Sequence, residues 1–352
     1  MKARSIQAGV ILLAASAAVV PVPAAWVERA YSERAYLALE RHLTAWSNRV
    51  PFAVTDVVLS AAVTAGGWIL VQAVRRARRA GHSPGPPLFH ALTVAAVVYM
   101  AFLATWGLNY RRPPLRSRLK FAADSVTPGA ALALARHVVE RLNAFRAVES
   151  NGAWPAWEDL PRALGPSFAR VQRELADVDP AVAGVPKRSL LAWYLDRAGV
   201  SGVTNPFVLE VVVDAGQLPF ERPFVTAHEW AHLAGYADES EANFVGWLVC
   251  LQGPPTAVYS AHLALLGSLL GALTPSEGQA VVGALDPGPR EDARAIQRRL
   301  TRVWPALERP AWWIYDRYLH ANRVELGVRS YGHAVELMLG TRFREGWVPV
   351  RR

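Results

Sequence analysis

Apolar residues are unevenly distributed along the chain, with three long runs before residue 110 and helical spacing after residue 127. The runs cover residues 6–25, 52–74 and 88–108, and each is close to the ~20 apolar residues that a membrane-spanning helix needs. They predict three N-terminal transmembrane helices. The first run also resembles a secretory signal, because a basic leader precedes it and small residues end it. Its cleavage therefore stays open.

Basic residues flank these runs. Residues 75–87, between the second and third runs, carry four arginines and no acid, which is typical of a cytoplasmic loop. Residues 111–126, rich in Pro and Arg, put more positive charge after the third run and predict a linker. On balance the pattern favours a multi-pass protein of the cell membrane, with a cytoplasmic N-terminus and an extracytoplasmic main domain.

The other segments have mostly helical periodicity. Residues 26–46 predict an amphipathic helix lying in the membrane interface. Residues 127–352 predict a mainly α domain, and the run at 256–273 is expected to be a buried helix in it, with a fourth span as the alternative. The β-branched run at 207–213 predicts a small β element. Further helices are expected at residues 127–145, 166–178, 187–198, 290–303, 311–321 and 329–339.

The composition agrees with a membrane location. The 352 residues are 52% hydrophobic and only 19% charged, and the formal net charge is +9. Because the arginines lie beside apolar runs, the charge favours contact with a lipid bilayer over contact with nucleic acid. Cys250 is the one cysteine in the chain, which rules out an intramolecular disulfide, and its apolar neighbours predict a buried thiol.

The stretch HEWAH, residues 228–232, carries the clearest chemistry. Side chains four residues apart lie on one face of a helix, so His228 and His232 can bind one ion. This is the HExxH arrangement of zinc peptidases, in which the glutamate between the histidines activates a water molecule. The sequence therefore predicts Zn²⁺ bound by His228 and His232, with Glu229 as the catalytic base.

A third ligand is expected from the acids that follow. Glu239 is the preferred ligand, and it shares a helix face with Asn243, which is expected to accept the spare N–H of a ligand histidine. Glu241 points roughly 160° away from Glu239 on a helix, and Asp238 requires a tight turn after Gly235 to reach the metal. Both of these acids stay open as alternatives.

Several stretches resemble a bacterial membrane family catalogued as domain of unknown function 3810. They are YSERAY, PFAVTDVVL, WGLNYRR, HEWAHLAGYADESEANF and YDRYLHANRVELGVRSYGHAVELML, spread over most of the chain. The resemblance implies three N-terminal spans and a helical, zincin-like domain with an HExxH site. The segment ExxAN is also similar to the glutamate helix of other zinc peptidases, which implies Glu239 as a metal ligand. No substrate is implied.

These observations predict a membrane-anchored zinc metallopeptidase that acts on peptides or proteins. Tyr331 and His333 are the preferred donors to the oxyanion of the tetrahedral intermediate, chosen from a group of polar rings near the C-terminus. The members of that group are Tyr315, Tyr318, His320, Tyr331 and His333. A membrane regulator or scaffold that binds zinc without hydrolysis is the alternative function.

Overall fold

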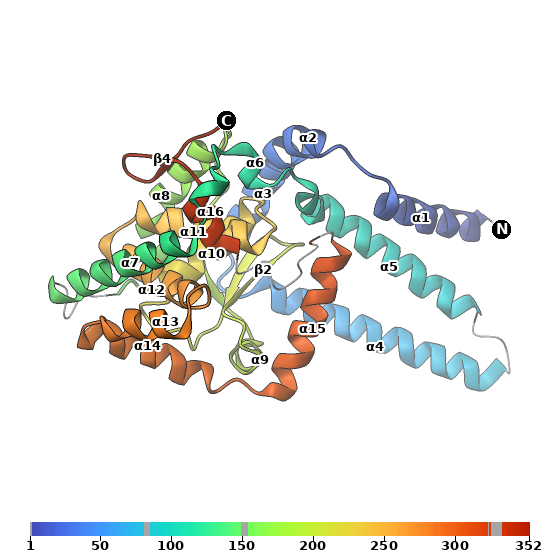
Figure 1. Cartoon of the computed structure of the whole chain (residues 1–352). Helices are drawn as coiled ribbons and strands as arrows, with labels where there is room; N and C mark the ends of the chain where they lie inside the picture. The colour runs from blue at the N-terminus through green and yellow to red at the C-terminus, as the bar shows by residue number, and fades with distance from the viewer. Residues whose placement is uncertain (1, 81–84, 149–153, 323, 325–332) are drawn as a thin grey trace.

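The chain forms a mainly helical body from which three apolar helices extend to one side (Figure 1). The structure is a computed structural model that describes residues 2–80, 85–148, 154–322, 324 and 333–352. The N-terminal part contains α1 (Lys2–Val19), α2 (Ala24–Trp26), the π-helix η1 (Val27–Tyr36), α3 (Leu37–Ser47), α4 (Val54–Ala80), α5 (Gly85–Thr105), η2 (Gly107–Arg111), α6 (Leu115–Arg118) and η3 (Ala123–Ser125).

Helices form where the three apolar runs were predicted to cross a membrane, as α1, α4 and α5. Within the described residues, however, no single helix combines the length and hydropathy that a crossing requires. One bent pair meets the requirement when taken together, Arg4–Val19 with Ala24–Ser47, and its two parts make an angle of 105°. The apolar parts of α4 and α5 are shorter, Val54–Ile69 and Phe89–Thr105.

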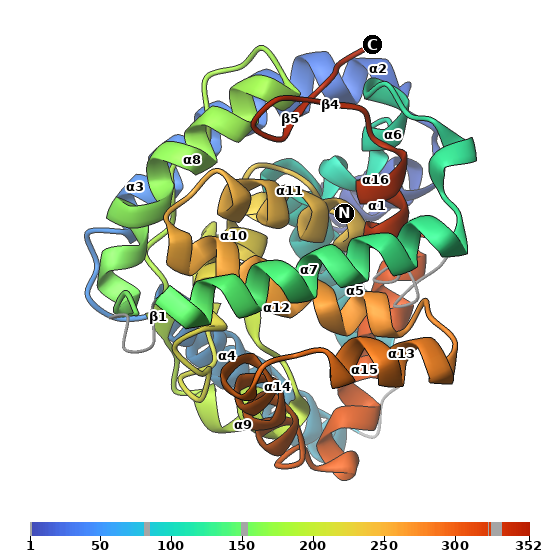
Figure 2. The same ribbon diagram turned by 60° about the vertical axis from the view of Figure 1, so that its left-hand side comes forward.

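Helices also dominate the C-terminal part. They are α7 (Pro128–Val148), η4 (Trp157–Asp159), α8 (Leu160–Leu175), α9 (Ala192–Ala198), α10 (Arg222–Leu233), α11 (Glu239–Leu251), α12 (Pro255–Leu270), α13 (Pro275–Gly283), α14 (Pro287–Leu300), α15 (Pro305–Ala321) and α16 (Ala334–Gly340). In Figure 2, α10 and α11 lie in the middle, with α8 on one side and α7 and α12 on the other. The run at 256–273 becomes α12, whose inner face is buried.

A small sheet lies beside α10. It has the strand order β1-β3-β2, with β1 (Lys187–Arg188) parallel to β3 (Glu210–Val213) and β2 (Gly202–Asn205) antiparallel to it. The predicted strand at 207–213 is therefore shorter, and β3 is central, with β2 at an edge. A second pair, β4 (Phe343–Arg344) and β5 (Val348–Pro349), lies near the C-terminus.

One hydrophobic core joins the two halves of the sequence. It contains Tyr36 and Leu37 from the front segment together with Trp230 and Trp247 from α10 and α11. Residues 26–46, predicted to lie in a membrane interface, pack most of their apolar face into this core, whereas Trp26 and Trp46 stay exposed. An amphipathic pattern specifies an apolar neighbour and does not distinguish lipid from protein.

Candidate metal centre

The two histidines of the motif lie one turn apart on α10. The helix begins at Arg222 with Pro223 in its first turn, and Gly235, with a φ of 81°, follows its end. Glycine suits that left-handed position because it has no Cβ to clash with the backbone. The rings of His228 and His232 are 4.8 Å apart at an interplanar angle of 89°. One nitrogen of each ring lies within 4.8 Å of the other, so both imidazoles can reach one ion.

Glu239 brings a carboxylate to the same position from the first turn of α11. Its Oε2 is 3.3 Å from His228 Nε2 and 3.6 Å from His232 Nε2. Ligand atoms at tetrahedral angles on a metal, with bonds of ~2.0–2.1 Å, are separated by roughly 3.3–3.4 Å. The observed separations are close to this value, and two imidazoles and a carboxylate are a usual donor set for Zn²⁺. The three residues fit a zinc ion.

The two alternative acids have other partners. Asp238 caps α11 by accepting hydrogen bonds from Ser240 N and Glu241 N. Glu241 Oε1 accepts a hydrogen bond from Leu115 N at 2.5 Å. Among the described residues, one group of potential metal ligands is close enough to hold a single ion. It consists of His228, His232 and Glu239, whose ligand atoms all lie within 4.8 Å of one another.

Close packing of α10 on α11 makes this geometry possible. A Cβ on Gly246 of α11 would lie only 2.9 Å from His228 N, so glycine allows the two helix backbones to approach. Oε2 of Glu239 is buried and faces the imidazole nitrogens of His228 and His232 at 3.3 and 3.6 Å. A buried carboxylate needs a positively charged partner, and either a protonated imidazole or a bound cation would supply it.

Hydrogen bonds orient two of the three ligands. His232 Nδ1 is 2.7 Å from Tyr236 O, which leaves Nε2 directed at Glu239. The expected role of Asn243 is therefore wrong among the described contacts, because the turn carbonyl takes the Nδ1 contact of His232 and Nδ1 of His228 has no partner. Tyr315, on α15, donates a hydrogen bond to Glu239 Oε1. Such contacts fix ligand orientation and raise metal affinity.

The pKa values of the ligands indicate a proton held in the metal-free centre. Burial alone lowers the pKa of His232, but the Glu239 carboxylate outweighs burial and raises this pKa to about 9. Burial opposes ionisation of Glu239, yet the two imidazoles hold its pKa well below its usual range. A positive charge is therefore favoured at this position. Zinc would replace the proton on His232, because metals bind neutral imidazole.

Glu229 lies beside the ligands and is buried. Thr204, on β2, donates a hydrogen bond of 2.8 Å to Glu229 Oε2. A Cβ on Gly202 of the same strand would lie 2.7 Å from Glu229 Oε1, so the strand backbone is in close contact with this carboxylate. Burial raises the pKa of Glu229, against the opposing effect of His228 and His232. A raised pKa suits a group that both accepts and donates protons.

The strand that contacts Glu229 lies at the edge of its sheet, and among the described residues no strand pairs with its outer side. Asp214 N donates to Ser201 O, so alternate residues of β2 pair with β3 and the backbone groups of Gly202 and Thr204 point away from it. The sequence predicted a strand only at residues 207–213, whereas the strand that contacts Glu229 is β2. It missed β2 because four residues that include Gly202 and Asn205 have little strand propensity.

The front segment supports the end of α10. Tyr36 donates a hydrogen bond to Leu233 O at 2.8 Å, Trp106 Nε1 donates to His232 O at 3.2 Å, and Arg112 donates to Gly235 O at 2.9 Å. The last carbonyls of a helix have no partner within it and need such donors. Residues before 113 therefore help to hold the second histidine in place.

No described contact places the predicted oxyanion donors, Tyr331 and His333, at the site. Tyr331 lies outside the described residues, and His333 pairs with Glu336 at 3.0 Å on the surface. Tyr315, from the same group of polar rings, reaches Glu239 instead. The sequence could not single it out, because no spacing rule relates α15 to α11.

Comparisons with known proteins identify one match. The family model described as "Protein of unknown function (DUF3810)" matches residues 31–339. No curated protein and no solved structure matches the chain. The function must therefore be inferred from the residues of the site.

Proposed function

This chain belongs to the family of proteins of unknown function DUF3810, and we propose that it is a membrane-anchored zinc metallopeptidase. The observation that carries the proposal is the convergence of His228, His232 and Glu239, whose ligand atoms lie within 4.8 Å, beside the buried Glu229. Three protein ligands leave a fourth tetrahedral position open, as in catalytic rather than structural zinc sites.

The residues of the site have separate roles in the proposed reaction. His228, His232 and Glu239 hold the ion, which when bound supplies a Lewis acid that polarises the peptide carbonyl. Glu229 accepts a proton from the attacking water and transfers it to the leaving amine. Thr204 holds the Glu229 carboxylate through the 2.8 Å hydrogen bond, so the base is positioned before substrate binds.

An extended peptide fits the free edge of β2. The backbone groups of Gly202 and Thr204 that point away from β3 would pair with a substrate strand, which is how sheet edges bind peptides. Because the Glu229 carboxylate contacts the same strand, a peptide bound there would pass close to the base. Recognition through the backbone favours peptides over other amides.

Membrane anchoring is supported by the exposed apolar side chains of the front helices, such as Val63 and Trp68 on α4 and Val97 on α5. We place the C-terminal domain outside the cytoplasm of a bacterial cell, as the arginine-rich loop at 75–87 favours. A reporter enzyme fused after Arg352 tests this sidedness, with activity expected for the periplasmic reporter and not for the cytoplasmic one.

The test of the mechanism is Glu229→Gln in the full chain. We expect this variant to keep the zinc of the wild type and to lose peptide cleavage by at least ~10²-fold, since general-base catalysis contributes ~10²–10⁴-fold. Glu241→Gln is the matched control, because Glu241 is a neighbouring acid that bonds to Leu115. Full activity of Glu229→Gln would exclude the mechanism. A wild type that binds zinc but cleaves no peptide library would favour the non-hydrolytic regulator.

A further inference from the structure

Large apolar side chains are exposed on α9, on α15 and on the segments that precede them. We call this set the α9–α15 ridge, and its members are Leu190, Trp193, Trp304, Trp313 and Ile314, which are 86%, 58%, 46%, 62% and 60% exposed. The ridge is continuous at its centre, because the rings of Trp193 and Trp304 meet edge to face at 5.6 Å. Exposed apolar patches of this kind mark contact with a membrane or a protein.

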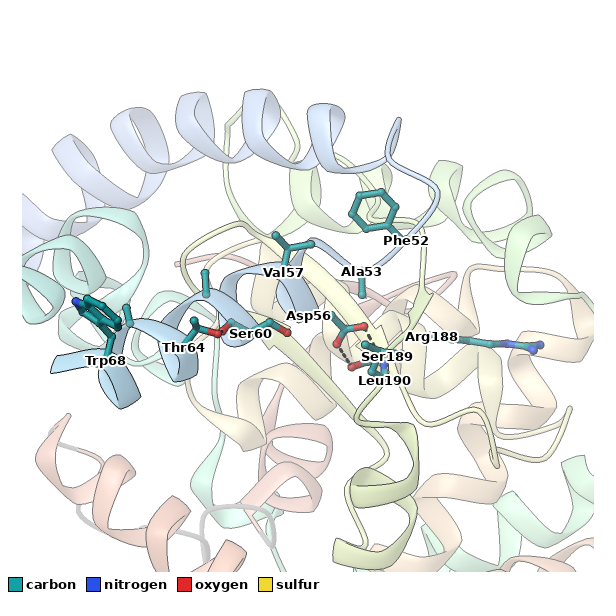
Figure 3. Close-up of a pocket in the computed structure, with 12 residues that line it drawn as sticks. Phe52, Ala53, Asp56, Val57, Ser60, Thr64, Trp68, Arg188, Ser189 and Leu190 are labelled. Carbon is teal, nitrogen blue, oxygen red and sulfur yellow. Dashed lines mark hydrogen bonds between the residues drawn. The ribbon is translucent and has the colours of Figure 1, made fainter. Parts of the chain in front are cut away.

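The ridge joins the first turns of α4. Leu190 N donates a hydrogen bond to Asp56 Oδ2 at 2.8 Å, and Ser189 Oγ bonds to the same carboxylate. Figure 3 shows these contacts at the end of an open groove of about 1140 Å³ that follows α4 as far as Trp68. Most of its lining is apolar, with the exposed Val57 among the residues. The ridge therefore continues an apolar surface that runs along α4.

One face of α15 is exposed, and the opposite face packs against the body of the protein. Trp313 and Ile314 are exposed, whereas Tyr315 reaches Glu239 of the metal centre and Leu319 is fully buried. At about 100° per residue, the two pairs occupy opposite sides of the helix. Tyr318 of α15 packs edge to face against Phe102 of α5, with ring centres 5.9 Å apart, and Figure 1 shows α15 on the side of the body from which the apolar helices extend. The exposed face of α15, with Trp313 and Ile314, is therefore part of the surface from which the apolar helices extend.

Cations accompany the indole rings. The guanidinium of Arg197 lies 4.9 Å from the ring centre of Trp304, and that of Arg317 lies 5.5 Å from the ring centre of Trp313. Tryptophan and arginine together are typical of the lipid headgroup region, where the ring enters the apolar boundary and the cation binds phosphate. We therefore favour lipid over a protein partner as the occupant of the ridge, since a protein partner would not require arginine–tryptophan pairs beside an apolar helix.

We propose that the α9–α15 ridge is a second membrane contact, which seats the C-terminal domain on the headgroup region of the bilayer beside the first turns of α4. The proposal rests on the membrane anchoring in the proposed function and does not depend on peptidase activity. It assigns to Leu190, Trp193, Trp304, Trp313 and Ile314 a role as interfacial anchors. Because Tyr315 lies on the same helix, the metal centre would then be held close to the membrane surface.

The test measures lipid contact at single positions in the full chain. The native Cys250 is buried, so a cysteine introduced at an exposed position takes a maleimide fluorophore selectively. Leu190→Cys and Ile314→Cys probe the ridge, and Val63→Cys probes α4. Val282→Cys on α13, also an exposed apolar residue, is the matched control. Each labelled protein is reconstituted into phosphatidylcholine–phosphatidylglycerol vesicles that carry a spin-labelled lipid as quencher.

We expect the labels at 190 and 314 to be quenched at least about twofold more than the label at 282, since interfacial side chains enter the headgroup–acyl boundary. Quenching at 63 without quenching at 190 and 314 would overturn the ridge proposal and leave the anchoring intact. Quenching at none of the four positions would overturn both. Peptidase activity is not part of the readout, so loss of the catalytic proposal would be seen separately.

Discussion

A single added methyl group on β2 tests whether the contact between this strand and Glu229 matters for catalysis. The change is Gly202→Ala, which the backbone tolerates because Gly202 has no left-handed φ. The new Cβ would lie 2.7 Å from Glu229 Oε1, whereas ordinary contact begins at 3.4 Å. Glu229 must then move by roughly 0.7 Å, and a displacement of ~1 Å at a catalytic group can cost ~10²-fold in rate.

The expected result for Gly202→Ala is a fall in kcat/KM on the order of 10- to 100-fold, with zinc content unchanged, because the methyl group meets the base and not a ligand atom. Overpacking should lower the free energy of unfolding by about 1–3 kcal/mol. The assay is cleavage of a peptide that the wild type cuts, with zinc measured in the same preparation. Val203→Ala is the control, since Val203 is exposed. Wild-type kcat/KM in Gly202→Ala would refute the reasoning.

Three further predictions concern the surroundings of the site. Tyr36→Phe removes the donor to Leu233 O and should lower the free energy of unfolding by ~1–3 kcal/mol, measured by denaturant titration; an unchanged midpoint would contradict this. Tyr315→Phe should weaken zinc binding by roughly 10-fold in a chelator competition, because Glu239 loses an orienting contact, and equal affinity would exclude that role. Cys250, whose burial raises the pKa of its thiol, should react with a thiol reagent only after unfolding, and rapid reaction of the native protein would contradict its burial.

Local periodicity predicted that His228, His232 and Glu239 come together as a candidate metal-binding group, and the structure brings them together. The four-residue step of His228 and His232, and the boundaries of α10, depend on helix geometry that neighbouring residues determine. Glu239 was preferred because it shares a helix face with Asn243 and because ExxAN resembles the glutamate helix of zinc peptidases, and the structure brings its carboxylate to the two imidazoles. These relations span only a dozen residues.

Contacts between distant segments were beyond a single sequence. Tyr36 reaches Leu233 O across almost two hundred positions, and no pattern of apolar residues specifies that pairing. The contact of Gly202 with Glu229 also depends on the pairing of β2 with β3, which follows from packing rather than from propensity. The membrane role of the apolar runs stays a prediction, because the same residues can be covered by lipid or by protein.

Metal analysis of the purified full chain tests the central claim that His228, His232 and Glu239 hold zinc. The account predicts close to one zinc per wild-type chain, near-complete loss of it in Glu239→Gln, and its retention in Glu241→Gln, in which a neighbouring acid of α11 is changed. Absence of zinc from the correctly folded wild type, or full zinc content in Glu239→Gln, would contradict the account.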